Sequence, residues 1–136
     1  MPDPLLKRIS DNSMTDRMKS DYNTALKVRD DATFMEIAAN APEVYDWYKD
    51  SFYGKIFYGG RVDVRSKELL RLRLSMTHGC AFCNKGNIED ARRAGISEEK
   101  LIKIMNEDSE VFNNKERAVL RLASEVVFSN MSGTLN

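Results

Sequence analysis

Apolar residues recur at helical spacing along most of this chain, and this pattern constrains its fold more than any other feature of the sequence. No segment shows the alternation of apolar and polar residues expected of a half-buried strand, and no internal repeat or low-complexity stretch is present. The sequence therefore predicts an all-α fold, a small bundle of about six helices. We expect helical segments near 16–30, 32–39, 42–58, 65–77, 80–94, 98–105 and 113–127.

Capping residues mark several of these helix ends. Gly95 suits the left-handed conformation that commonly ends a helix. Ser97 can cap the next helix, since its side chain can accept a hydrogen bond from a free backbone N–H group. Asn113 followed by Glu116 resembles a capping box, and it predicts the start of the last helix.

Length and charge limit the classes of protein to consider. The 136 residues fit one domain, which we place at 14–136, after an N-terminal arm at 1–13 that contains two prolines. The 21 Lys and Arg residues balance the 21 Asp and Glu residues, so the basic excess of many nucleic-acid-binding proteins is missing. No apolar run approaches the roughly 20 residues of a membrane span, and no signal sequence is recognisable. We expect a cytoplasmic protein that binds neither nucleic acid nor membrane.

The two cysteines, Cys80 and Cys83, lie three residues apart at the start of a predicted helix. Cα atoms at this helical spacing lie roughly 5 Å apart, which a disulfide accepts, and a helix N-terminus stabilises a thiolate. In a reducing cytoplasm such a pair indicates reactive or metal-binding cysteines. We favour a redox-active pair over inert buried cysteines. A metal site is the weakest alternative, because His78 would be a third ligand and no second histidine or second CxxC supplies a fourth.

Two other groups of residues have a structural and a functional interpretation. The basic residues Lys67, Arg71 and Arg73 are expected to face solvent or form ion pairs, and we assign them no catalytic role. Aromatic residues crowd the helix near 42–58, where they form a core, a subunit contact or the lining of a substrate pocket. Because a small bundle does not readily bury so many rings, we expect a homo-oligomer. The aromatic residues are Tyr45, Trp47, Tyr48, Phe52, Tyr53 and Phe57.

Four short motifs follow one another along the chain. They are Lys67-Glu68-Leu69-Leu70-Arg71-Leu72, His78-Gly79-Cys80-Ala81-Phe82-Cys83, Ala91-Arg92-Arg93-Ala94-Gly95-Ile96-Ser97 and Glu116-Arg117-Ala118-Val119-Leu120. Their order and spacing resemble the carboxymuconolactone decarboxylase family, and within it the alkylhydroperoxidase-like branch, over about 42–127. The resemblance implies a small all-α homo-oligomer that reduces hydroperoxides with two thiols, uses no prosthetic group and is reduced again by an external dithiol.

The resemblance also implies roles for single residues. Cys83 resembles the cysteine that attacks the peroxide, Cys80 the resolving cysteine, and Glu68 the carboxylate that begins a proton relay. The histidine of that relay falls four residues after the second cysteine, where this chain has Asn87. An amide forms hydrogen bonds but does not shuttle a proton at neutral pH. His78 is a substitute base, or else an exposed or helix-capping histidine.

Three functions follow as hypotheses. The leading one is a thiol peroxidase or disulfide reductase with Cys83, Cys80 and Glu68 at its centre. The second is a redox-sensing or scaffold protein that keeps the thiol pair without turnover, because Asn87 replaces the histidine. The third is a decarboxylase of the kind that gives the family its name, which leaves the paired cysteines unexplained. Glu68 itself is otherwise an ordinary ion-paired carboxylate.

Overall fold

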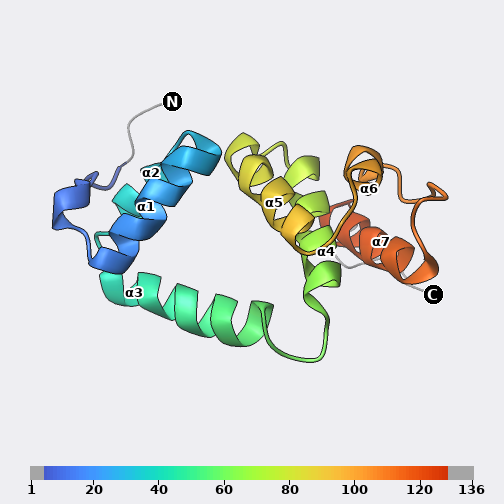
Figure 1. Cartoon of the computed structure of the whole chain (residues 1–136), viewed down its shortest axis with the longest axis horizontal. Helices are drawn as coiled ribbons and strands as arrows, with labels where there is room; N and C mark the ends of the chain where they lie inside the picture. The colour runs from blue at the N-terminus through green and yellow to red at the C-terminus, as the bar shows by residue number, and fades with distance from the viewer. Residues whose placement is uncertain (1–4, 129–136) are drawn as a thin grey trace. The chain divides into compact units, whose positions relative to one another are not determined.

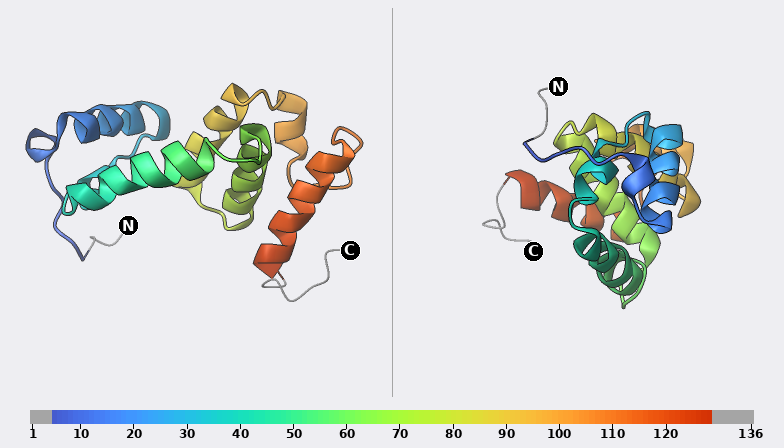
Figure 2. Two further views of the ribbon diagram at one scale, coloured as in Figure 1. Left: turned by 90° about the horizontal axis from the view of Figure 1, so that it is seen from below. Right: turned by 90° about the vertical axis from the view of Figure 1, so that its left-hand side faces the viewer.

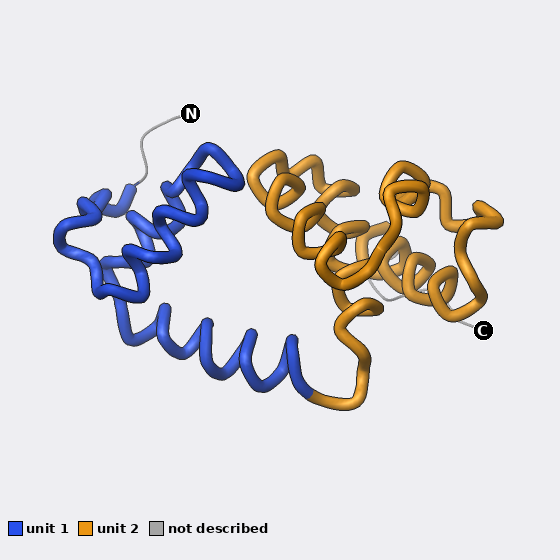
Figure 3. Tube along the Cα trace, in the orientation of Figure 1, with its two compact units in different colours: residues 1–59 blue, residues 60–136 orange. Residues whose placement is uncertain are grey.

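The computed structural model describes residues 5–128, and the regular elements in this range are helices, with no strand (Figure 1). The all-α prediction is therefore confirmed. The chain divides into two compact units, residues 1–59 and 60–136 (Figure 3). The boundaries proposed from the sequence, an arm at 1–13 and a single domain at 14–136, remain a prediction. Residues 1–4 and 129–136 lie outside the described residues.

The first unit is built around the helix α1 (Asp16–Arg29). Thr15 begins this helix by accepting a hydrogen bond from the Met18 N–H group at 3.3 Å, and Asp30 ends it in the left-handed conformation at φ 58°. The small core of the unit consists of Met14, Met18 and Tyr45. The other elements are η1 (Asp11–Ser13), α2 (Thr33–Ala38), α3 (Pro42–Trp47) and η2 (Tyr48–Phe57).

The aromatic helix predicted at 42–58 is made of two elements. Pro42 begins the α-helix α3, and the chain then continues as the π-helical η2. The wider winding is visible at its end, where the Tyr58 N–H group donates to the Tyr53 carbonyl oxygen, five residues earlier, at 2.8 Å. Gly59 follows, and a Cβ atom there would lie 2.5 Å from the Lys55 carbonyl oxygen. Only glycine permits this close end to the helix.

The second unit contains α4 (Val64–Thr77), α5 (Ala81–Arg93), α6 (Glu98–Lys103) and α7 (Asn114–Phe128). Within this unit α4 packs against both α5 and α7 and lies between them (Figure 2). Its apolar side chains, Leu69 and Leu72 above all, are therefore buried from two sides. The core of the unit consists of Leu69, Leu72, Ala91, Ile96, Leu101, Ile104, Phe112 and Leu120.

Most of the predicted helix ends are confirmed. Gly95 has φ 79°, the left-handed conformation expected after the cysteine helix. At the start of α7 the Glu116 N–H group donates to Asn113 Oδ1 and the Asn113 N–H group donates to Glu116 Oε2, each at 3.0 Å, so the capping box is formed. Ser97 occupies the N-cap position of α6 but makes no capping hydrogen bond with its side chain.

Of the two alternatives expected for Arg73, exposure to solvent and an ion pair, the structure shows an ion pair with Glu107. The Arg73 side chain is 7% exposed, so it faces the interior of the unit and not solvent. The guanidinium donates to the Ile104 carbonyl oxygen at 2.9 Å and to Ser124 Oγ at 3.1 Å, and it lies 3.5 Å from a Glu107 oxygen. Because these partners come from α7 and from the segment after α6, Arg73 ties α4 to both.

Candidate functional site

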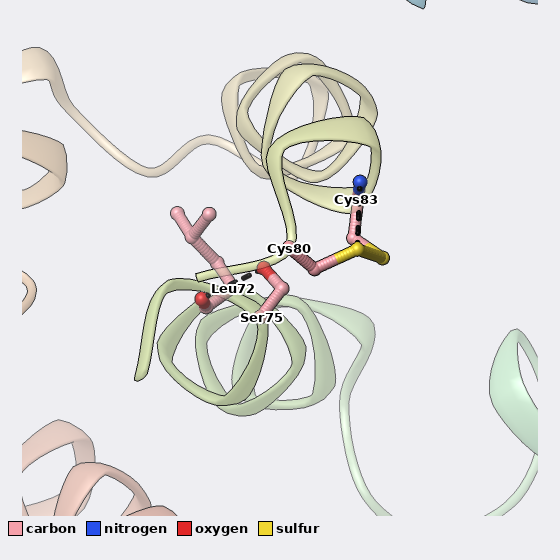
Figure 4. Close-up of a disulfide and its surroundings, with 4 residues drawn as sticks. All are labelled: Leu72, Ser75, Cys80 and Cys83. Carbon is pink, nitrogen blue, oxygen red and sulfur yellow. Dashed lines mark hydrogen bonds between the residues drawn. A yellow bond between two sulfur atoms is a disulfide. The ribbon is translucent and has the colours of Figure 1, made fainter. Parts of the chain in front are cut away.

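The two cysteines form a disulfide at the N-terminus of α5 (Figure 4). Their Cα atoms lie 5.2 Å apart, in agreement with the distance expected from the helical spacing. Cys80 is the N-cap residue, and its Sγ accepts a hydrogen bond from the Cys83 N–H group at 3.2 Å. Both residues are half-buried. At this position a backbone donor stabilises negative charge on Cys80.

A tight connection between α4 and α5 sets this position. α4 ends at Thr77, and Gly79 adopts φ 65°, which glycine does without strain. The Cys80 N–H group then donates to the Ser75 carbonyl oxygen at 3.1 Å. This bond returns the chain to the last turn of α4, so the cysteines start α5 directly beside the end of α4.

Ser75 was not identified from the sequence, although it lies beside Cys80 in the structure (Figure 4). The residue is 8% exposed, and its hydroxyl group donates to the Leu72 carbonyl oxygen at 3.0 Å. A serine on an apolar helix is a weak signal, because hydroxyl groups commonly bond back to their own helix. The tight turn after α4, which brings Ser75 to Cys80, is not readable from Ser75 itself.

Glu68 is buried in α4, with 1% of its side chain exposed. It lies 2.5 Å from Arg71, and Arg71 lies 2.8 Å from Asp90 on α5. Burial raises the pKa of Glu68 and the Arg71 guanidinium works against this rise, so that the pKa stays above its ordinary value. The structure thus brings Glu68 together with Arg71 and Asp90 as an ion-pair network between two helices.

Arg71 and Asp90 are the functional candidates that sequence reasoning missed. Arg71 was expected only to face solvent or form an ion pair, and it forms two. Its spacing of three residues from Glu68 was the available signal, because side chains at i and i+3 on a helix are neighbours. Asp90 carried no signal of its own, since its contact with Arg71 depends on how α4 and α5 pack.

Asn87 and His78 occupy contrasting positions. Asn87 is on α5, one turn after Cys83, and it is 6% exposed. Asn87 therefore lies in the interior, at the position where the resemblance places the histidine of the relay. Its side chain is an amide. His78 is exposed at the C-terminal end of α4, where its backbone N–H group donates to the Leu74 carbonyl oxygen at 3.0 Å. Whether either residue contributes to turnover remains a prediction.

The grouping of side chains and the lengths of the helices bear on metal binding and on membrane insertion. Between residues 5 and 128, no three His, Cys, Asp or Glu side chains are grouped so that they could hold a metal ion. Over the same described range, no helix is both long enough and apolar enough to cross a membrane.

Comparisons with known proteins give one family and one curated relative. The family model described as "Carboxymuconolactone decarboxylase family" matches residues 42–125. A protein of Bacillus subtilis (strain 168) described as "Uncharacterized protein YdfG" is 32% identical over 63 residues, which are 45% of this chain and 42% of that protein. The chain thus matches less than half of that relative's length. No solved structure matches the chain.

Proposed function

This chain belongs to the carboxymuconolactone decarboxylase family, and from that premise we propose that it reduces hydroperoxides with the thiols of Cys80 and Cys83. The observation that carries the proposal is the disulfide at the N-terminus of α5, with Cys80 Sγ bonded to the Cys83 N–H group. A pair that closes on one helical turn beside backbone donors has the features of a reversible, reactive disulfide.

The reaction proceeds in two steps. The Cys83 thiolate attacks the OH-bearing oxygen of the hydroperoxide, the O–O bond breaks, and the departing alkoxide takes a proton to leave as an alcohol. Cys83 is then a sulfenic acid. Cys80 attacks the Cys83 sulfur, the S–O bond breaks, and water leaves as the disulfide forms. An external dithiol supplies two electrons and two protons to restore both thiols.

The roles within the pair follow the family resemblance. The hydrogen bond from the Cys83 N–H group stabilises a thiolate on Cys80. This suits a resolving cysteine, since the group that attacks the sulfenic acid must itself be a thiolate. The same bond would also suit Cys80 as the attacking residue, so variants of each cysteine are needed to assign the roles.

A second function is favoured by the surroundings of Glu68. Asn87 does not transfer protons, and the Glu68 carboxylate is held by Arg71 at 2.5 Å. A thiol pair without a proton relay would still form and break its disulfide, but slowly. The alternative is therefore a redox-sensing or scaffold protein that records oxidation without appreciable turnover.

The proposal includes partners and a compartment. The substrate is a hydroperoxide, the reductant a small protein or molecule with a dithiol, and the working state a homo-oligomer. A supply of reduced dithiols is typical of the cytoplasm, so we propose that compartment.

Stoichiometric and steady-state measurements test the proposal together. The reduced protein is treated with one equivalent of hydrogen peroxide, and free thiols are counted by alkylation and mass spectrometry. We expect both thiols to disappear with the loss of two hydrogens, and Cys80→Ser to trap a sulfenic acid on Cys83. Cys83→Ser should abolish the first step, and the opposite result would reverse the two roles. Persistence of two alkylatable thiols would refute the proposal.

Steady-state turnover, measured with several dithiol donors, then distinguishes a peroxidase from a sensor of oxidation.

A further inference from the structure

Met105 lies in the turn that follows α6, and its sulfur is bonded to a buried arginine. The residue is 47% exposed. Arg73 Nη1 donates a hydrogen bond to Met105 Sδ at 3.5 Å, and the Arg73 side chain is 7% exposed. The other methionines between residues 5 and 128 are buried or partly buried, and they are Met14, Met18, Met35 and Met76. Met105 is therefore the most exposed methionine in this range, and it alone among them is bonded to the Arg73 cation.

The guanidinium of Arg73 has more donors than strong acceptors around it. A guanidinium carries five N–H groups and accepts no hydrogen bond. Nη1 donates to the Ile104 carbonyl oxygen at 2.9 Å as well as to the Met105 sulfur, and Nη2 donates to Ser124 Oγ at 3.1 Å. Nε is inaccessible to solvent and has no acceptor among the described residues. Because a thioether sulfur is a weak acceptor, a stronger acceptor in its place would meet a charged donor that is already in position.

Oxidation by a hydroperoxide supplies that acceptor. The Met105 sulfur attacks the OH-bearing oxygen with a lone pair, the O–O bond breaks, and the proton of the attacked O–H group passes to the departing oxygen. The sulfur gives up two electrons and becomes a sulfoxide, while the hydroperoxide is reduced to an alcohol or to water. A sulfoxide is polar and disrupts an apolar core. Beside a guanidinium its oxygen has a charged hydrogen-bond donor instead.

We propose that Met105 is a modification site, at which a hydroperoxide oxidises the thioether to a sulfoxide whose oxygen accepts a hydrogen bond from the Arg73 guanidinium. Because a hydrogen bond from a charged donor is stronger than one from a neutral donor, the modified turn is held more firmly to α4. Neither cysteine takes part, so the site is separate from the proposed peroxidase centre and does not depend on its turnover. The modification is reversible, since methionine sulfoxide reductases restore the thioether.

The test compares the unaltered protein with Met105→Leu, which keeps an apolar side chain of similar size and removes the sulfur. Both proteins are treated with hydrogen peroxide and then with dithiothreitol, which opens the disulfide and leaves sulfoxides intact. Mass spectrometry of peptides follows the oxidation of each methionine, and thermal unfolding is recorded before and after the treatment. Because the two proteins share every other methionine, a difference between their responses is caused by Met105.

We expect Met105 to be oxidised at least about tenfold faster than Met18, which is 1% exposed. On oxidation the unfolding temperature of the unaltered protein should rise by about 2 °C relative to the change in Met105→Leu. An equal change in the two proteins, or a relative fall in the unaltered one, overturns the inference. So does a Met105 thioether that persists while Met18 is oxidised.

Arg73→Met tests the donor directly. This variant removes the guanidinium, so oxidation of Met105 should not raise its unfolding temperature. A rise equal to that of the unaltered protein would contradict the role of Arg73. If Arg73→Met does not fold, the comparison with Met105→Leu still decides whether the sulfoxide stabilises the folded state.

Discussion

The carboxylate of Glu68 and the guanidinium of Arg71 lie 2.5 Å apart on one face of α4, and the Glu68 side chain is 1% exposed. The same guanidinium lies 2.8 Å from Asp90 on α5. One cation thus holds two carboxylates from two packed helices. Because an ionised carboxylate is expensive to bury without a partner, Arg71 favours the charged form of Glu68 and opposes the rise of its pKa caused by burial.

Replacing Arg71 with methionine should destabilise the protein in a pH-dependent way. The pKa of Glu68 is raised by burial, so stability falls as the pH rises from the usual 4.5 through the higher value in the folded state. Without Arg71 that pKa rises further and the loss grows. We expect Arg71→Met to cost about 3 kcal/mol at pH 7, and less as the pH approaches 4.5, in urea unfolding followed by circular dichroism.

Two further variants control this measurement. Arg93→Met removes an exposed arginine that lies 3.4 Å from Asp90, and it should change stability little. Glu68→Met combined with Arg71→Met removes both charges and should recover most of the loss. A loss in Arg71→Met that stays constant between pH 4.5 and pH 7 would show that the guanidinium contributes by packing and not by holding a charged Glu68.

The ionisation of Glu116 should make the stability of the protein depend on pH below 4.5, whereas the effect of Glu68 lies above 4.5. Burial works to raise the pKa of Glu116, but Lys100, the Asn113 N–H group and Arg65 together hold it below its usual 4.5. Its contribution to stability is therefore complete above pH 4.5 and is lost as the pH falls through the lowered value. Glu116→Gln should cost about 2 kcal/mol at pH 7. The stabilities of Glu116→Gln and the unaltered protein should converge below pH 4.5 in acid titrations, and parallel curves would contradict the assignment.

Local signals were sufficient to predict the helices and much of the geometry of the cysteine pair. Cys80 at a helix start and the capping box of Asn113 and Glu116 depend on residues three positions apart, and such local relationships are readable from sequence. The winding of η2 was not predictable in the same way, because the aromatic residues of 48–57 have a periodicity that an α-helix shares.

Relationships between helices were the ones that sequence reasoning did not provide. The contact of Arg71 with Asp90 and the approach of Ser75 to Cys80 depend on how α4 and α5 pack. An arginine or a serine does not by itself indicate its partner in the sequence. Arg73 was expected to face solvent or to form an ion pair; it forms one with Glu107, and its long side chain also reaches a carbonyl group and a hydroxyl group inside the unit, which the sequence did not indicate. Whether a polar residue on a mostly apolar helix faces solvent or finds a partner inside the unit thus depends on how the helices pack.

We predict that the protein self-associates through the segment 42–57. Trp47 and Ile56 on this segment are 59% and 61% exposed, which is much apolar surface for a small protein to leave in water. Sedimentation at micromolar concentration should show a dimer or a larger species, and Trp47→Ser with Ile56→Ser should shift it toward 15.6 kDa. Ile102→Ser, at a position on α6 that is 78% exposed, is the control and should change nothing. A monomer of 15.6 kDa for the unaltered protein would contradict the prediction.

One substitution at the buried position Asn87 distinguishes the hypothesis of a peroxidase from that of a sensor of oxidation. Asn87 lies one turn after Cys83 on α5 and is 6% exposed. If a histidine at this position can accept and return a proton, Asn87→His should raise peroxide turnover at least tenfold, nearer the ~10²-fold lower end of general acid–base effects. The rate is measured in steady state with hydrogen peroxide and a dithiol donor.

A second substitution, at Glu68, tests whether the gain comes from proton transfer by the new histidine. In the Asn87→His background, Glu68→Gln should remove most of the gain, because a carboxylate orients an imidazole and stabilises its positive form, and an amide does so less well. Because Arg71 at 2.5 Å favours the charged form of this carboxylate, Asn87→His combined with Arg71→Met should gain less than Asn87→His alone, provided that the double variant is folded. His78→Gln tests the remaining base: a large loss of turnover in the otherwise unaltered protein would mean that the exposed histidine already moves the proton. Turnover equal to that of the unaltered protein in Asn87→His, in its Glu68→Gln derivative and in His78→Gln would mean that no relay operates between α4 and α5. The thiol pair would then be better explained as a sensor of oxidation than as the centre of a peroxidase.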